Sequence, residues 1–237
     1  MKFCHKILLY TDYNLNEILN NGIDPHKITV INNTINEIPH IKAAKSVTAN
    51  QLNLVTQQTR ASKHTLLFIG RLTRAKRPDL LIPIAKKLLG VFPDLRLIVI
   101  GDGEEKNTLE AKIHKNGLER NIFLLGAITD PKQLAPYMKS ADFSILPGAV
   151  GLSIVHSFIY GLPFVTLKDA PHGPEIAYLK SGENGYFAED ITDLSNWLIR
   201  SFNNPEQIKI MKKNCELLIQ KQVTLENMIK NFINALQ

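Results

Sequence analysis

From about residue 65 the chain alternates short apolar runs with longer amphipathic ones, and this alternation limits its possible folds more than any other feature. The short runs are mostly apolar without a regular polar alternation, as expected of strands buried on both faces of a sheet. They are TLLFIG (65–70), LRLIVIG (95–101), IFLLG (122–126), FSILP (143–147) and PFVTL (163–167). The four segments between them are typical of helices. The pattern predicts right-handed βαβ units and an α/β fold, with a Rossmann-like parallel sheet and helices on both faces.

Glycines fall at or just beyond the ends of four runs, at Gly70, Gly101, Gly126 and Gly148. In an open parallel sheet the ligand binds outside the carboxyl ends of the strands, where the connecting loops meet. We therefore expect these four loops to face one binding site.

The flanking segments differ from this pattern. Residues 1–31 hold two short apolar runs, KILLYT and KITVI, around a short helical stretch, and are too few to enclose a core of their own. Residues 32–62 are polar, as in a linker, with one expected surface helix near 48–58. Beyond Asn184-Gly185 the spacing of apolar residues predicts three further helices.

The charge of the chain is +6, and its basic residues are scattered through helical stretches. Solvated helix faces explain this better than a dedicated binding patch. The alternative is an attraction to anionic membrane lipids or to a phosphorylated lipid acceptor, which would allow peripheral membrane contact. Few aromatic residues interleave with the basic ones and no nucleic-acid motif is present, so a nucleic-acid partner is not expected.

No apolar run approaches the ~20 residues that span a bilayer. The N-terminal segment lacks the apolar core and the cleavage site of a signal peptide. Cys4 and Cys215 lie far apart in the sequence without metal-ligand spacing, and are expected to be free thiols in a reducing compartment. These features predict a cytoplasmic protein, with the inner face of the membrane as a possible peripheral location.

The first group of candidate site residues is Gly70-Arg71-Leu72-Thr73-Arg74-Ala75-Lys76, directly after a predicted strand. Arg71 and Lys76 could place two cations over the strand end, where a diphosphate would lie, since a guanidinium fork and an ammonium both suit phosphate oxygens. On spacing alone, a solvated basic loop before a helix is the better interpretation.

The second group runs from a strand end into a predicted helix and comprises Gly148, Gly151, Leu152, Ser153 and His156. The glycines allow close approach of a ligand, and free N–H groups at the helix start favour an anion. His156 lies about one turn beyond Leu152 and Ser153, on the same face. A lone histidine of this kind is more often packed or solvated than functional.

The third group is His172-Gly173-Pro174-Glu175, just after the fifth predicted strand. Gly-Pro indicates a tight turn that leaves Glu175 in the first turn of a helix. The carboxylate there either favours the helix dipole or accepts hydrogen bonds from sugar hydroxyls.

Together these segments, in this order, resemble the C-terminal, donor-binding domain of glycosyltransferase family 4, the group 1 glycosyltransferases of GT-B fold. The resemblance covers about residues 65–190. Residues 6–36 resemble the end of that family's N-terminal domain. The resemblance implies that the chain is divided into a remnant of the N-terminal domain with its linker (1–62), a Rossmann-like nucleotide-sugar-binding domain (63–222) and a C-terminal helix (223–237).

The resemblance also implies roles for these residues. Arg71 and Lys76 match the pair that binds the donor diphosphate and would be catalytic. The family's usual Glu-x7-Glu pair is replaced by Gly148 and His156. A neutral imidazole can still bind a ribose hydroxyl, and Glu175 is the candidate substitute for the sugar-binding acid. The remaining donor-binding candidates are Gly70, Gly126, Gly151, Leu152 and Ser153. With no DxD motif, neither a metal nor another cofactor is expected.

The implied function is a retaining transfer from a nucleotide sugar to a saccharide or lipid-linked acceptor, in the synthesis of cell-surface polysaccharide or lipopolysaccharide. Because most of the family's N-terminal domain is absent from this sequence, a separately encoded N-terminal domain is one expected partner. The alternatives are a catalytically inactive nucleotide-sugar-binding domain and a sugar-nucleotide epimerase of similar fold, although no paired acids suited to proton transfer are found. A nicotinamide enzyme is disfavoured, because no GxGxxG follows a strand.

Overall fold

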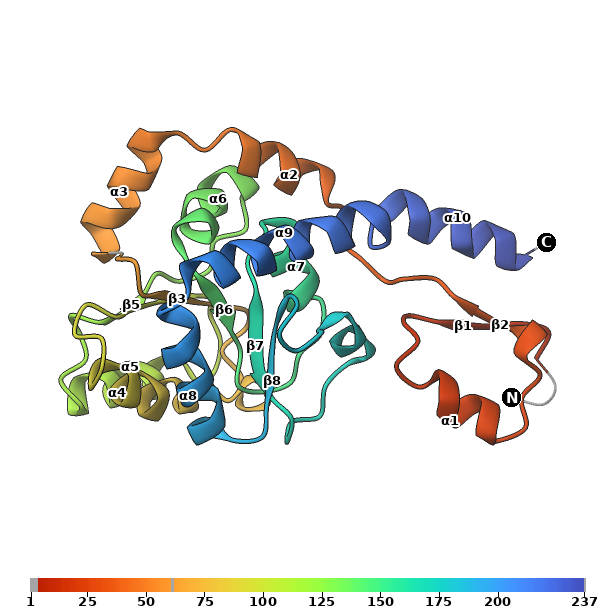
Figure 1. The fold of residues 1–237 in the computed structure, drawn as a ribbon, viewed down its shortest axis with the longest axis horizontal. Coiled ribbons are helices and arrows are strands. Elements are labelled where there is room, and N and C mark those ends of the chain that lie inside the picture. Colours follow the sequence, from red (N-terminus) through yellow and green to blue (C-terminus); the bar gives the residue numbers. More distant parts are fainter. Residues whose placement is uncertain (1–3, 61, 237) are drawn as a thin grey trace.

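The computed structural model describes residues 4–60 and 62–236 of the 237-residue chain (Figure 1). Its centre is a parallel sheet of six strands in the order β5-β4-β3-β6-β7-β8. The strands are β3 (Thr65–Ile69), β4 (Arg96–Ile100), β5 (Ile122–Leu124), β6 (Phe143–Ile145), β7 (Phe164–Leu167) and β8 (Gly185–Ala188). The predicted α/β fold is confirmed. The sequence pattern had indicated five of these strands and had missed β8.

Helices lie on both sides of the sheet, with α4, α5 and α8 on one side and α6 and α7 on the other (Figure 1). Their bounds are α4 (Leu81–Leu89), α5 (Lys106–Lys115), α6 (Pro131–Ser140), α7 (Ser153–Ile159), α8 (Ile191–Phe202) and α9 (Pro205–Lys221). The 3-10 helices η2 (Arg74–Lys76), η3 (Pro78–Leu80) and η4 (Pro174–Tyr178) lie in the loops. Every residue of β3, β6 and β7 is buried, which explains why these strands are apolar without alternation.

A small unit at the N-terminus stands apart from this sheet. It contains β1 (Ile7–Leu9), α1 (Leu15–Asn20), η1 (Pro25–Lys27) and β2 (Ile28–Val30), and its two strands pair in parallel. None of its strand residues is buried. A two-stranded sheet is marginal by itself, so this unit depends on contacts with other parts of a protein.

The linker carries two helices, where one was expected. The predicted helix is α3 (Ala49–Thr59), and a capping box between Thr48 and Gln51 fixes its start. The unexpected helix is α2 (Ile38–Lys45), a short segment with a proline in its first turn. It packs against α6, and this tertiary contact stabilises a segment whose own sequence pattern is weak.

The last helix, α10 (Leu225–Leu236), extends from the end of α9 toward the N-terminal unit and contacts β2 (Figure 1). Two hydrogen bonds tie its start to the linker: the Thr34 hydroxyl donates to the carbonyl of Val223 (3.0 Å), and the Leu225 N–H donates to the Glu37 carboxylate (3.0 Å). Among the described residues, no helix combines the length and apolar character needed to cross a membrane.

The strand order reverses between β3 and β6, because the chain moves outward from β3 to β4 and β5, then returns to β6 on the other side. At such a switch point the loops after the two central strands diverge and leave a crevice at their carboxyl ends. The loop after β3 holds Arg71 and Lys76, and the loop after β6 holds Gly148 and Gly151. The first two predicted groups therefore meet at this point.

Candidate active site

A row of glycines crosses the carboxyl edge of the sheet. Gly101 has a φ of +156°, and a Cβ there would lie 1.9 Å from the carbonyl oxygen of Gly70. The Gly101 N–H donates to the carbonyl of Gly126 (2.8 Å). Gly70 and Gly101 thus allow the backbones after β3 and β4 to touch. Gly126 lies after the edge strand β5, two strands from β3, at the far end of the predicted site.

The loops after β3 and β6 are locked together by close backbone contact. A Cβ on Gly148 would lie 2.2 Å from the carbonyl oxygen of Ala75 and 2.4 Å from the carbonyl carbon of Lys76. The Ala149 N–H donates to the Ala75 carbonyl (2.7 Å), and the Lys76 ammonium donates to the Ala149 carbonyl. Lys76 is therefore held at the switch point by the loop that carries Gly148.

Three charged groups converge here. Burial lowers the pKa of Lys76, and the nearby Arg71 guanidinium lowers it further, while the Glu175 carboxylate acts in the opposite direction. Arg71 is exposed, and its guanidinium makes no hydrogen bond or ion pair with the described part of the chain. An anion between Arg71 and Lys76 would relieve the repulsion between them, so the pair suits a phosphate group.

Glu175 is a buried acid at the first turn of η4, with 5% of its surface exposed. Its Oε1 accepts a hydrogen bond from the side-chain amide of Asn33 (2.6 Å), 142 residues earlier in the chain. Its Oε2 lies beside Gly151 and Gly173. The third predicted group therefore joins the other two.

His172 braces the loop after β6. Its Nδ1 accepts the N–H of Val150 (3.2 Å), so its Nε2 carries the proton and donates to the Leu167 carbonyl (2.7 Å). Burial lowers the pKa of His172, which favours this neutral form. The Gly173 N–H donates to the Val150 carbonyl (2.7 Å) and completes the connection between the loops after β6 and β7.

The start of α7 offers a second polar surface. Leu152 is exposed just before the helix, and the Ile154 N–H donates to the Gly151 carbonyl (3.2 Å). The hydroxyl oxygen of Ser153 is buried and has no hydrogen-bond partner among the described residues. A buried polar atom left unpaired is costly, so this hydroxyl is a candidate contact for a polar ligand.

His156 packs against the linker helix α2. Its Nε2 lies 3.3 Å from Nδ1 of His40 on α2, and the two rings meet edge to face with centroids 4.6 Å apart. The same His40 nitrogen lies 2.8 Å from the Tyr160 hydroxyl. Burial, with a smaller contribution from His40, lowers the pKa of His156 to about 4. The ribose contact of His156 stays a prediction, because its Nε2 already faces His40.

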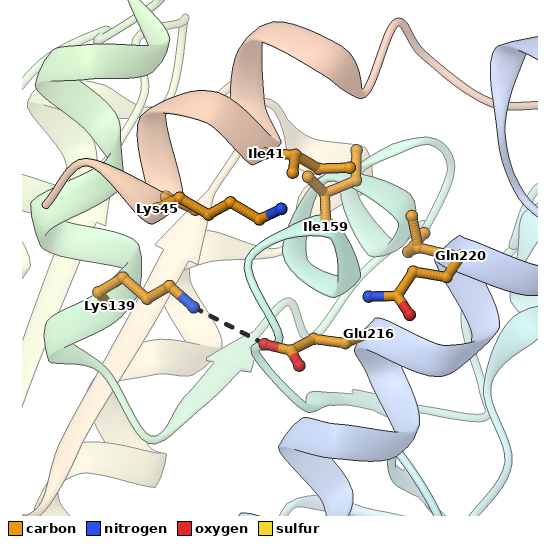
Figure 2. A pocket seen from close by; sticks show the side chains of 8 residues that line it. Ile41, Lys45, Lys139, Ile159, Glu216 and Gln220 are labelled. Atoms are coloured by element: carbon orange, nitrogen blue, oxygen red, sulfur yellow. Dashed lines mark ion pairs between the residues drawn. The ribbon is translucent and has the colours of Figure 1, made fainter.

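A separate hollow of about 490 Å³ lies between α2, α6, α7 and α9 (Figure 2). Lys45 and Lys139 extend into it, and the Lys139 ammonium lies 3.9 Å from the Glu216 carboxylate. None of the predicted site residues lines this hollow. The described residues also contain no group of three or more His, Cys, Asp or Glu side chains arranged to hold a metal ion.

Sequence reasoning missed Asn33, His40 and the bracing role of His172. Asn33 and His40 lie in the polar linker, where no local pattern distinguishes them from solvated residues. Their partners are 142 and 116 residues away, so only the tertiary fold brings them to the site. His172 had a local signal in its position directly before Gly-Pro-Glu.

Comparison with solved structures shows the same fold. An Anabaena protein, HepE, whose crystal structure is in complex with UDP, superimposes with a TM-score of 0.79 at 18% identity, over 99% of this chain and 64% of that chain. The C-terminal domain of a Francisella tularensis group 1 glycosyl transferase, LpcC, matches with a TM-score of 0.64 at 18% identity, over 81% of this chain and 99% of that domain.

Curated relatives share more of the sequence. An uncharacterised glycosyltransferase of Methanocaldococcus jannaschii is 28% identical over 71% of this chain and 44% of its own length. A Staphylococcus aureus poly(ribitol-phosphate) alpha-N-acetylglucosaminyltransferase is 28% identical over 70% of this chain and 34% of its own length. An Acholeplasma laidlawii alpha-monoglucosyldiacylglycerol synthase is 24% identical over 91% and 54%.

The chain thus spans about a third to a half of the length of these curated relatives. The sequence model of the glycosyl transferases group 1 family matches residues 53–218, which include all the loops described above. The chain belongs to the group 1 glycosyl transferase family.

Proposed function

We propose that the chain is the donor-binding half of a retaining, metal-independent glycosyltransferase, which transfers a sugar from a nucleotide sugar to a saccharide or lipid-linked acceptor. The observation that carries this proposal is the placement of Arg71 and Lys76 at the switch point, with Lys76 held against the loop of Gly148. The names of similar proteins support it: HepE is solved with UDP, and the A. laidlawii relative is named as a glycolipid synthase.

In glycosyl transfer, negative charge develops on the departing nucleoside diphosphate while the sugar becomes cationic. Fixed cations stabilise that charge most strongly where it develops. Arg71 and Lys76 would hold the diphosphate, with the glycines of the strand ends giving it room. The Ser153 hydroxyl and the start of α7 would add polar contacts, His156 would contact the ribose, and Glu175 the sugar. The relatives favour a role in making cell-surface polysaccharide or glycolipid.

Arg71→Ala is expected to weaken UDP binding at least tenfold, about 1.4 kcal/mol, because it removes one of the two cations at the diphosphate. Isothermal titration calorimetry with UDP measures the effect. Arg74→Ala is the matched control: it lies in the same loop, but its side chain is 90% exposed and pairs with Glu105. Unchanged affinity in Arg71→Ala, or equal losses in both variants, would contradict the assignment.

Adding magnesium or a chelator is expected to leave UDP affinity unchanged within about twofold, since two protein cations would neutralise the diphosphate. The same calorimetric titration, run first with magnesium in excess over UDP and then with excess EDTA, tests this expectation. A strong dependence on the metal would show that the diphosphate is neutralised in another way.

We further propose that sugar transfer requires an N-terminal domain beyond the matched half, either on the same polypeptide or separately encoded. The unburied strands β1 and β2 support this proposal, as do the exposed apolar residues of α10, namely Ile229, Phe232, Ile233 and Leu236. Such a surface is typical of one that another domain covers. The alternative is a binding domain without catalysis. We expect the isolated chain to bind UDP but to release no sugar from UDP-sugars. Sustained sugar transfer by this half alone would contradict the proposal that an N-terminal domain is required.

A further inference from the structure

A short hydrogen bond connects the linker with Glu175 of the candidate site. The Asn33 amide donates to Oε1 of Glu175 (2.6 Å), while the backbone carbonyl of Asn33 accepts the hydroxyl proton of Tyr178 (3.0 Å). The Thr11 hydroxyl donates to the Pro174 carbonyl (2.6 Å). These three hydrogen bonds connect the N-terminal unit and the linker with η4, and the one from the Asn33 amide engages a carboxylate.

Two glycines approach the Glu175 carboxylate closely. A Cβ on Gly173 would lie 2.8 Å from Oε2, and a Cβ on Gly151 would lie 4.0 Å from it. Within residues 4–60 and 62–236, Oε2 accepts no hydrogen bond, whereas Oε1 is taken by Asn33. The carboxylate is therefore clamped at one oxygen and keeps the acceptor capacity of the other beside the glycines of the site.

The Glu175 carboxylate interacts electrostatically with the Lys76 ammonium. Glu175 acts on Lys76 in the direction that raises the pKa of that ammonium, so the two groups are close enough to interact. Burial raises the pKa of Tyr178, and the carboxylates of Glu175 and Asp12 raise it further, which keeps the Tyr178 hydroxyl protonated. A buried carboxylate needs hydrogen bonds. Asn33 supplies one to Glu175, whereas Lys76 acts on Glu175 without forming an ion pair with it among the described residues.

We propose that Asn33 is a positioning residue, which holds the Glu175 carboxylate so that Oε2 accepts a hydroxyl of the donor sugar. This rests on the proposed function, in which Arg71 and Lys76 hold the diphosphate. It assigns the recognition of the sugar to a pair formed between the linker and η4, separate from the recognition of the nucleotide. The position of the linker then determines whether Glu175 can recognise the donor sugar.

The experiment compares UDP with two UDP-sugars, UDP-glucose and UDP-N-acetylglucosamine, by calorimetry on the full chain. The quantity of interest is the dissociation constant of the better-bound sugar nucleotide divided by that of UDP. Asn33→Ala is expected to raise this ratio about fivefold to tenfold, as loss of a hydrogen bond to a charged group does. UDP affinity should stay within about twofold, because Asn33 does not contact the cations. Glu175→Gln should raise the ratio in the same direction.

Tyr178→Phe is the matched control, since it removes the hydrogen bond to the Asn33 backbone and leaves the amide–carboxylate bond in place. Its ratio should match that of wild type. Asn33→Asp supplies a second readout. At pH 8 the two carboxylates are ionised and repel each other, so the ratio should be raised. At pH 5 the pair takes up a proton and the protonated Asp side chain again donates to Glu175, so the ratio should return toward wild type.

Equal weakening of UDP and UDP-sugar binding in Asn33→Ala, or an equal change in Tyr178→Phe, would show a merely structural role and overturn the proposal. An unchanged ratio in Asn33→Ala would overturn it as well, while intact UDP binding would leave the proposed function standing. Wild-type chain that binds neither UDP nor a UDP-sugar would overturn the proposed function and, with it, this inference.

Discussion

Gly148→Ala is expected to lower the free energy of unfolding by about 3 kcal/mol or more and to remove measurable UDP binding. The added Cβ would lie 2.2 Å from the Ala75 carbonyl oxygen and 2.4 Å from the Lys76 carbonyl carbon. Both atoms belong to the backbone, so no side chain can rotate away. The loop after β3 must shift, and it carries the two cations of the site. Urea denaturation followed by circular dichroism measures the stability, and calorimetry measures the binding.

Gly151→Ala is the matched control for this prediction. Its new Cβ would meet nothing nearer than Oε2 of Glu175 at 4.0 Å, and Gly151 is not among the glycines with positive φ. Its stability should remain within about 1 kcal/mol of wild type. A Gly148→Ala protein as stable as Gly151→Ala would mean that the two loops are not in contact.

Acid is expected to destabilise the chain by about 3 kcal/mol between pH 7.5 and pH 4 through His156 alone. Burial lowers the pKa of His156 from its ordinary value of 6.5 to about 4. Below pH 6.5 the unfolded chain therefore binds a proton that the folded chain refuses, so stability is complete above pH 6.5 and is lost as the pH falls toward 4. Denaturation curves at several pH values measure this slope.

His156→Phe should flatten the slope, since the ring still packs against His40 and Tyr160 but takes up no proton. The burial of His40 and His172 lowers the pKa of each and adds loss in the same direction, so the informative quantity is the difference between wild type and variant. His114→Gln is the control, because His114 is exposed and pairs with Glu119. A wild-type slope that survives in His156→Phe would contradict the prediction.

The sheet was predictable because the local sequence identifies most of its strands. β3, β4 and β7 are apolar runs bounded by glycine, proline or charged residues, and burial on both faces requires that composition. β8 escaped prediction because its four residues begin with Gly185 and include the half-buried Tyr186 and Phe187. The expected sheet was therefore one strand too narrow.

The candidate site was predictable only in part. Arg71, Lys76 and Glu175 follow strands, and strand ends converge in a parallel sheet, so local sequence places them together. The partners that hold them come from far away in the sequence. Asn33 reaches Glu175 and His40 reaches His156 only because the linker folds back over the domain. Nothing in the polar composition of residues 32–62 specifies that path.

The close backbone contact at Gly148 also limits which residues this position can hold. The family's usual acid at this position would need a side chain where the Ala75 and Lys76 backbone now lies. A glutamate at this position would therefore fit only after the loop after β3 had moved away. Replacement of Gly148 by a larger residue therefore depends on a second change that moves the loop after β3, so the two loops can change only together.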